Sequence, residues 1–246
     1  MTTGTRQAMF IAQVRAEQRI FWRNLSSVFF TFVLPIVLLF ALALGDDPAA
    51  NVPYIIALSV ISTAFQGLGM QLAMHRDQGV LKGLMSTPLP PWILIVAKAV
   101  SIALIILLEI VFVVSASALL FGAALPDHPA GLFAFVLLGT ACFAALAFAL
   151  VSIIPNSDSA PAVMNGAYLA ILMSSILTRT IDNVPHALYV FGGLIPFAAL
   201  VDQVKLTWFG PWHGFPWGSS AVLLGWFVLG TLWTIRRFRW EPGTTT

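Results

Sequence analysis

Long apolar segments alternate with short polar ones along the whole chain, and this alternation predicts the fold. A membrane-spanning helix needs about 20 consecutive apolar residues. Six segments approach or exceed this length, and several end at glycine, proline or aspartate, which interrupt helices. We therefore expect an all-α, polytopic membrane protein with six transmembrane helices, at residues 27–44, 52–73, 92–121, 131–154, 160–177 and 217–235.

The first 26 residues are too polar to span a membrane, but they have an amphipathic pattern. Apolar side chains gather on one side of a helical wheel, namely Phe10, Val14 and Phe21. A separate basic stripe recurs every four residues, at Arg15, Arg19 and Arg23. This pattern predicts an interfacial helix whose cations face anionic lipid headgroups. The alternative is a solvated arm that precedes the first span.

Residues 178–216 are too polar and too often interrupted by proline to form a seventh span, although residues 186–200 are largely apolar. Backbone that does not span is tolerated at membrane depth only where protein or a wet cavity satisfies its polar groups. We expect short re-entrant helices here, before the last span.

The charges fix an expected orientation. Only 9% of the residues are charged and 59% are hydrophobic, whereas a soluble domain has about 25% charged residues. Ten of the twelve lysine and arginine residues fall on one side of a six-span arrangement. Basic loops stay in the cytoplasm, so both termini should be cytoplasmic. We expect a single domain over residues 1–246, with a helix bundle at 27–235 and a cytoplasmic tail at 236–246.

Two ionisable residues lie inside the third apolar segment. Glu109 falls near its middle, where a charge is costly and usually faces a bundle interior or a cavity. Glu109 could therefore line a substrate pathway, as a cavity or proton-linked carboxylate or as a contact to a cationic substrate. Alternatively, it could be a protonated or hydrogen-bonded packing residue. Lys98 lies nearer the end of the segment, from which we expect its side chain to reach the cytoplasmic headgroups.

Motifs of the common catalytic and nucleotide-binding sites are missing from the sequence. It contains no G-x-x-x-x-G-K-[ST] phosphate loop, no G-x-S-x-G and no H-E-x-x-H. The histidines and aspartates predicted to lie outside the membrane match no compact metal-ligand spacing, and the basic residues form no stripe for nucleic acid. We expect no catalytic residues, no cofactor and no metal in this chain. The single cysteine, Cys142, is expected to be a buried apolar residue.

The polar segment between the second and third spans carries the most specific motif. It has the form R-D-x-G-x-L-x-x-L-x-x-T-P-L-x-x-W, formed by Arg76, Asp77, Gly79, Leu81, Leu84, Thr87, Pro88, Leu89 and Trp92. A polar turn follows the fourth span at residues 156–158. A third motif, P-x-x-x-L-x-D-x-x-K, precedes the last span at Pro196, Leu200, Asp202 and Lys205. Together with the six-span pattern, these motifs resemble the ABC-2 type transporter permeases, which include bacterial drug and antibiotic exporters.

The resemblance implies an ATP-driven exporter of the bacterial plasma membrane. The loop would be a coupling helix that rests on a separate ATPase, through Arg76, Asp77, Gly79, Leu81, Lys82, Leu84, Thr87 and Pro88. The ATPase, present in two copies, would bind ATP and Mg²⁺. A second permease subunit, identical or related, would complete the pump. The substrate would be an amphipathic drug, natural product or lipid, passing Glu109 and an outer gate at Ile195, Pro196, Phe197 and Leu200.

Two other functions remain open on the residues alone. An ion-driven carrier or channel would favour paired charges within the membrane or interrupted helices in both halves of the chain. A membrane-embedded lipid-modifying enzyme would need a cluster of polar residues at one depth. The sequence shows one deep carboxylate, at Glu109, so we favour the transport subunit.

Overall fold

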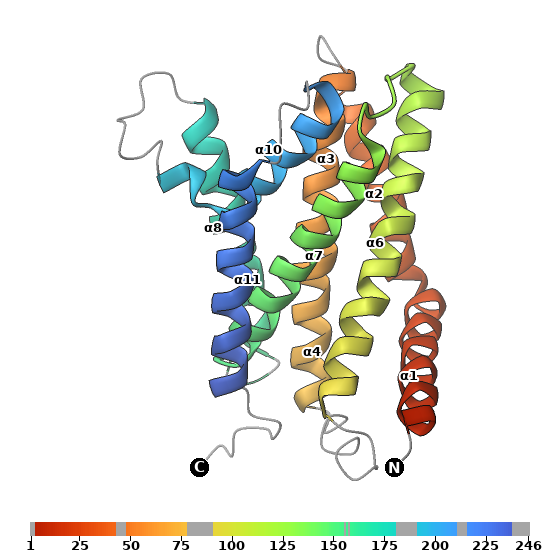
Figure 1. Ribbon diagram of the computed structural model, residues 1–246, viewed down its shortest axis with the longest axis vertical. Coiled ribbons are helices and arrows are strands. Elements are labelled where there is room, and N and C mark those ends of the chain that lie inside the picture. The colour runs from red at the N-terminus through yellow and green to blue at the C-terminus, as the bar shows by residue number, and fades with distance from the viewer. Residues whose placement is uncertain are drawn as a thin grey trace.

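The computed structural model describes residues 3–42, 48–77, 91–154, 156, 158–180, 191–210 and 216–237, and all the regular elements in these ranges are helical. The predicted all-α class is confirmed. The bundle in Figure 1 is built from α1 (Thr3–Arg23), α2 (Leu25–Leu42), α3 (Pro48–Ile61), the π-helix η1 (Ser62–Gly67), α4 (Leu68–Asp77), α6 (Pro91–Phe121), α7 (Pro129–Val151), α8 (Ala160–Thr180), α10 (Pro196–Phe209) and α11 (Trp217–Arg237).

Several of these helices are long and apolar enough to cross a membrane. Within the described residues four pass on length and composition: Val52–Arg76, Ile93–Phe121, Pro129–Val151 and Trp217–Arg237. A fifth is added if α1 and α2, which meet at a bend of 76°, count as one broken span. The predicted segment at 160–177 is helical, as part of α8, but is not among them. A multi-pass helical membrane protein is confirmed, while six spans remain a prediction.

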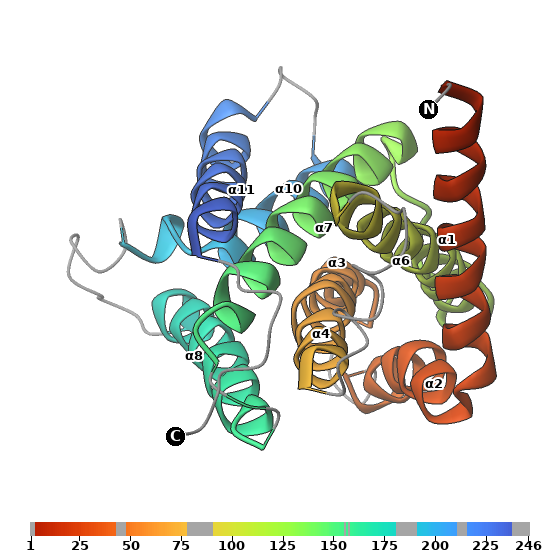
Figure 2. The same cartoon turned by 90° about the horizontal axis from the view of Figure 1, so that it is seen from below.

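The N-terminal helix is separate from the first predicted span, as the sequence indicated. Asn24 lies at the bend, and its side-chain oxygen accepts a hydrogen bond from the backbone N–H of Ser27 at 3.2 Å. Asparagine favours such helix starts because its side chain satisfies an N–H that lacks a partner in the helix. Figure 2 shows α1 lengthwise while α4 is seen end-on, so α1 runs across the bundle.

One continuous span forms the centre of the bundle. It consists of α3, η1 and α4, and it lies between α2, α6, α7 and α8 (Figure 2). Most of its apolar side chains are buried, among them Ile55, Ile56, Ile61 and Leu68. A π-helix inside an α-helical span places an extra residue in the turn and often marks a functional position. Here η1 turns polar side chains towards two different neighbouring helices.

A short helix precedes the last span. The 14 residues of α10 reach about 21 Å at 1.5 Å per residue, less than the hydrocarbon core of about 30 Å. It packs against α3, α7 and α11 at the end of the bundle opposite to the chain termini (Figure 1). The structure therefore contains a short buried helix where we expected one. A re-entrant path stays a prediction, because residues 181–190 and 211–215 are not described.

The ends of the basic segments meet at one end of the bundle. Figure 1 places the end of α4, the start of α6, the end of α11 and the whole of α1 at that end. These elements border the segments that carry most of the lysines and arginines. The basic segments therefore gather at one end of the bundle, and the cytoplasmic position of this end stays a prediction.

The last span packs backbone to backbone on α7. A Cβ atom added at Gly230 of α11 would lie 2.9 Å from the backbone carbon of Ala145 in α7, closer than real Cβ atoms approach. At Gly225, also in α11, a Cβ atom would meet nothing within 4 Å in the described structure. Glycine at position 230 therefore permits the contact between the two helices.

We expect Gly230→Ala to destabilise the protein and Gly225→Ala to leave it unchanged or more stable. Alanine favours a helix over glycine by about 1 kcal/mol at either position. At 230 this gain is opposed by an overpacking cost of about 1–3 kcal/mol, because backbone atoms of α7 cannot move aside. Thermal denaturation of the two purified variants measures the difference. Equal melting temperatures would contradict the close α7–α11 contact.

Candidate functional site

A cavity of about 640 Å³ lies inside the bundle. Its walls come from α1, α2, the central span of α3, η1 and α4, and α6, with Tyr168 contributed by α8. Most of the lining is apolar, but polar side chains gather at two levels. One level is where α1 crosses α6, around Lys98, and the other is beside η1, around Glu109.

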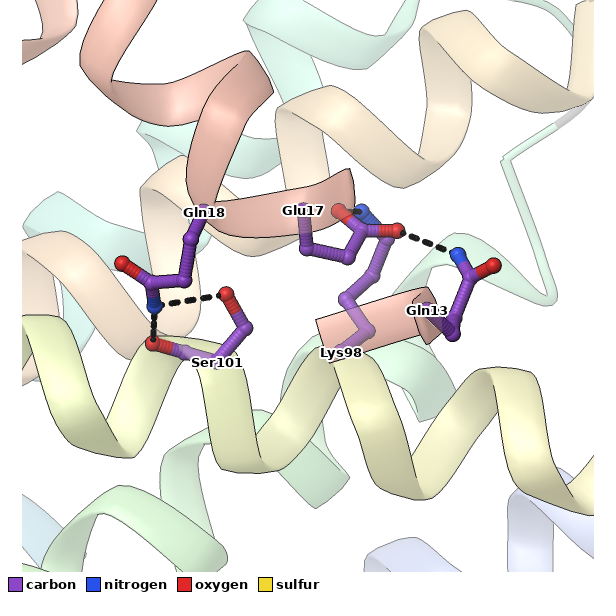
Figure 3. Close-up of polar contacts among 5 residues, drawn as sticks. All are labelled: Gln13, Glu17, Gln18, Lys98 and Ser101. Carbon is purple, nitrogen blue, oxygen red and sulfur yellow. Dashed lines mark hydrogen bonds and ion pairs between the residues drawn. The ribbon is translucent and has the colours of Figure 1, made fainter. Parts of the chain in front are cut away.

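A buried ion pair joins α1 to α6 at the first level, as Figure 3 shows. The Lys98 ammonium lies 2.7 Å from Glu17 Oε2, and the two side chains are only 4% and 10% exposed. Gln13 donates a hydrogen bond to the other Glu17 oxygen at 3.1 Å. One helical turn further along α6, the amide of Gln18 donates to the hydroxyl and the carbonyl of Ser101 at 2.9 and 2.8 Å. These contacts hold α1 against the bundle.

The structure corrects our expectation for Lys98. We expected its side chain to reach the headgroups, but it is 3% exposed and its charge is neutralised by Glu17. Sequence reasoning missed Glu17. The available signal was that Glu17 is the sole acidic residue among the first 24, set between the arginines of the basic stripe.

Glu109 lies at the second level and borders the cavity, with 1% of its surface exposed. Thr63 of η1 donates a hydrogen bond to Glu109 Oε2 at 3.3 Å. Ser59 lies close to the carboxyl group, yet its buried hydroxyl has no partner of normal hydrogen-bond geometry in the described structure. The prediction that Glu109 faces a bundle interior is therefore met, and the interior contains a cavity.

The π-helix also connects the central span to α8. The hydroxyl groups of Ser62 and Tyr168 lie 2.9 Å apart. The Gln66 side chain donates to Asn165 Oδ1. Consecutive polar residues of η1 thus reach α6 on one side, through Thr63, and α8 on the other. This polar belt crosses the bundle beside the cavity.

Arg76 anchors the end of the central span to the end of α7. The side chain is 4% exposed, and its guanidinium donates to the carbonyl oxygens of Val151 at 2.9 Å and Ile154 at 2.6 Å. Carbonyl groups at a helix C-terminus lack partners within the helix and carry partial negative charge. The buried guanidinium donates hydrogen bonds to these carbonyl oxygens and also places a positive charge beside their partial negative charge.

The comparisons with known proteins now decide the family. A family model described as ABC-2 type transporter matches residues 7–209. The chain belongs to the ABC-2 type transporter family. The match covers the chain from α1 to the end of α10, and with the apolar helices it makes this ABC-2 protein a multi-pass membrane component of a transporter. No curated protein sequence matches the chain.

The expected coupling residues of this ABC-2 chain fall mostly outside the described structure. Gly79, Leu81, Lys82, Leu84, Thr87 and Pro88 are not described, and Asp77 is the last residue of α4. We expected Arg76 to face a partner with these residues, whereas the structure places its guanidinium inside, on α7. Contact of these residues with a partner stays a prediction, and in the described structure Arg76 is buried.

The expected gate residues of the ABC-2 chain form packing contacts away from the cavity. Pro196 starts α10, directly after Ile195. The ring of Phe197 lies edge-on to Tyr54 of α3 at 5.5 Å, and Leu200 packs where a Cβ atom on Gly139 of α7 would lie. Glu109 borders the cavity and these four residues do not. The structure therefore does not bring together the two halves of the predicted substrate pathway.

Among the described residues, histidine, cysteine, aspartate and glutamate side chains form no group of three that could hold a metal ion.

Proposed function

We propose that this chain is the transmembrane permease subunit of an ATP-driven ABC-2 exporter that moves an amphipathic molecule out of the cytoplasm or inner leaflet. The observation that carries the proposal is the family match over residues 7–209. The cavity inside the bundle supports it, because a volume of about 640 Å³ lies in the range of sites for drug-sized molecules.

A separate ATPase, in two copies, would supply the energy. The sequence contains no phosphate-binding loop of its own. The segment at 79–88 follows α4 in the sequence, and Arg76, the last residue but one of α4, is bonded to the end of α7. A displacement of the loop would therefore move α4 and α7 together. Since α4 continues through η1 into α3, the same movement would reach Thr63 and Glu109 at the cavity.

A second permease subunit, either identical or related, would complete the pump. Large apolar side chains are exposed along α2 and α11, including Phe29, Phe40, Val228 and Leu232. Such faces suit contact with lipid tails or with another helix bundle. Interconversion between an inward-facing and an outward-facing arrangement of the two permeases would carry the substrate across. Multidrug efflux and antibiotic resistance are the roles that an exporter of amphipathic molecules would serve.

Charge reversal in the loop tests the coupling to ATP. We expect the double variant Asp77→Lys/Lys82→Glu to lose transport and substrate-stimulated ATPase activity while the permease still inserts and folds. The measurements are co-purification of the ATPase from native membranes, ATPase rate and substrate transport in reconstituted vesicles.

Arg236→Glu is the matched control, because Arg236 is exposed at the same end of the bundle, at the end of α11. We expect this variant to behave like the unmodified protein. Normal transport by the Asp77/Lys82 double variant would refute the coupling role of the loop. Transport by a chain that purifies without any ATPase would instead favour an ion-driven carrier.

A further inference from the structure

The charges around the cavity do not balance, and the imbalance indicates what the cavity binds. Among the described residues, the acidic and basic side chains that line it are Glu17, Lys98 and Glu109. Glu17 and Lys98 neutralise each other at 2.7 Å. No basic side chain in the described part of the chain forms an ion pair with Glu109. The lining therefore offers one carboxyl group without a counter-charge.

The surroundings of Glu109 can hold a cationic group. The hydrogen bond from Thr63 uses one carboxyl oxygen. The Ser59 hydroxyl, buried beside it, has no partner of normal geometry in the described structure. A buried polar atom without a partner costs free energy, which a ligand that reaches it would recover. The Tyr168 ring also lines the cavity, and aromatic faces attract cations.

The other walls fit an apolar body. Leu34 and Leu38 of α2, Ile55 of α3, and Ile102 and Ile105 of α6 line the cavity. The two α6 residues lie between Lys98 and Glu109 along that helix. The remaining polar side chains of η1 are already paired with α8, through Ser62 and Gln66. A ligand would thus meet a largely apolar surface, some polar side chains and one carboxyl group without a basic partner in the described structure.

We propose that this cavity binds a singly charged organic cation with an apolar body, one per chain, with the positive charge beside Glu109. The inference deepens the proposed function, on which it rests for the claim that the bound molecule is cargo. An anion of the same shape would gain the same apolar contacts but would meet the carboxyl group without any compensating cation. Charge sign, and not shape alone, should therefore decide binding.

Tetraphenylphosphonium and tetraphenylborate test this directly, because they have nearly the same shape and opposite charge. Binding is measured by scintillation proximity on the purified full-length permease with its co-purifying subunits, without ATP. We expect saturable binding of tetraphenylphosphonium at one per permease chain and none of tetraphenylborate. Because no hydrolysis is involved, loss of ATP coupling would leave this result unchanged, and absence of binding would leave the coupling test unaffected.

Two pairs of variants locate the site. We expect Glu109→Gln to weaken tetraphenylphosphonium binding by about tenfold or more, since a charge interaction is lost in a medium of low dielectric. Asp127→Asn removes an exposed carboxylate outside the cavity and should bind normally. Leu34→Trp fills the cavity from α2 and should abolish binding, whereas Val37→Trp, an exposed position of α2 outside the lining, should not.

The inference is overturned if both ions bind equally, because apolar volume alone would then explain binding. It is also overturned if Glu109→Gln and Leu34→Trp both bind tetraphenylphosphonium like the unmodified protein. The melting temperature of each variant shows that it is folded. Should Glu109→Gln fail to fold, the comparison of Leu34→Trp with Val37→Trp still decides the location of the site.

Discussion

Replacement of Glu17 by alanine should destabilise the protein by about 3–5 kcal/mol, because it leaves the Lys98 ammonium buried without a counter-charge. Both side chains are almost fully buried, and the two charged atoms lie 2.7 Å apart. Lys98→Ala should have an effect of similar size, since within the described residues it leaves the buried Glu17 carboxylate with the Gln13 amide as its side-chain donor. For a chain of this length the apparent melting temperature should fall by about 10 °C.

The double variant Glu17→Gln/Lys98→Met should be considerably more stable than either single alanine variant. Replacing both members of a buried ion pair removes the free-energy cost of burying charge. Removing one member leaves the other charge buried without compensation. The unmodified protein, Glu17→Gln, Lys98→Met and this double variant form a double-mutant cycle, which is measured by thermal denaturation in detergent. Arg19→Ala, an exposed change in the same helix, should melt like the unmodified protein. Additive effects of the two single changes would show that the pair does not couple α1 to α6.

The positions of the long helices could be predicted from the sequence because the signal for them is local. A segment of about 20 apolar residues must be helical in a membrane, since its backbone has no other partners. The predicted segments at 92–121 and 217–235 therefore agree closely with α6 at Pro91–Phe121 and α11 at Trp217–Arg237. The N-terminal helix could also be predicted, because its apolar and basic side chains gather on separate sides of a helical wheel. Its polarity showed that it does not span the membrane.

Features that depend on contacts between distant segments could not be predicted. The sequence places Glu109 deep in a span. The packing of η1 beside α6 is needed to show that Thr63 donates a hydrogen bond to Glu109 and that Glu109 borders a cavity. Residues 62–67 contain polar side chains, at Ser62, Thr63 and Gln66, but no local pattern specifies a π-helical turn, so the π-helix was missed. The pairing of Glu17 with Lys98 joins residues 81 positions apart.

The loop motif correctly indicated the family, but it could not show the contacts of each of its residues, because these contacts join distant segments. The motif that begins with Arg76 and Asp77 indicated the family, and the family match bears this out. The role of each residue within the motif depends on its neighbours in space. Arg76 is the first residue of the motif, but its guanidinium is bonded to α7. It lies beside the predicted partner-binding loop, and yet it stabilises the fold of the permease itself.

Arg76→Ala should consequently destabilise the permease even when no ATPase is present. The change removes two charge-assisted hydrogen bonds, each worth about 1.5–3 kcal/mol. The buried Ile154 carbonyl oxygen loses this donor, whereas the Val151 oxygen keeps the backbone N–H of Ile154 at 3.2 Å. We expect a loss of about 3–5 kcal/mol in thermal denaturation of the isolated permease. The stability of Arg76→Lys should lie between that of the unmodified protein and that of Arg76→Ala. An ammonium group cannot reproduce the planar guanidinium, which donates to both carbonyl groups.

Comparison with Arg236→Ala separates anchoring from partner contact. Arg236 is exposed at the end of α11, so its loss should leave the melting temperature unchanged. If Arg76 acted through a direct contact with an ATPase, Arg76→Ala would melt like Arg236→Ala and would lose only the co-purifying partner. If Arg76 anchors α4 to α7, the melting temperature of the isolated permease falls. Coupling is then also lost, because a displacement of the loop at 79–88 would no longer be passed from α4 to α7.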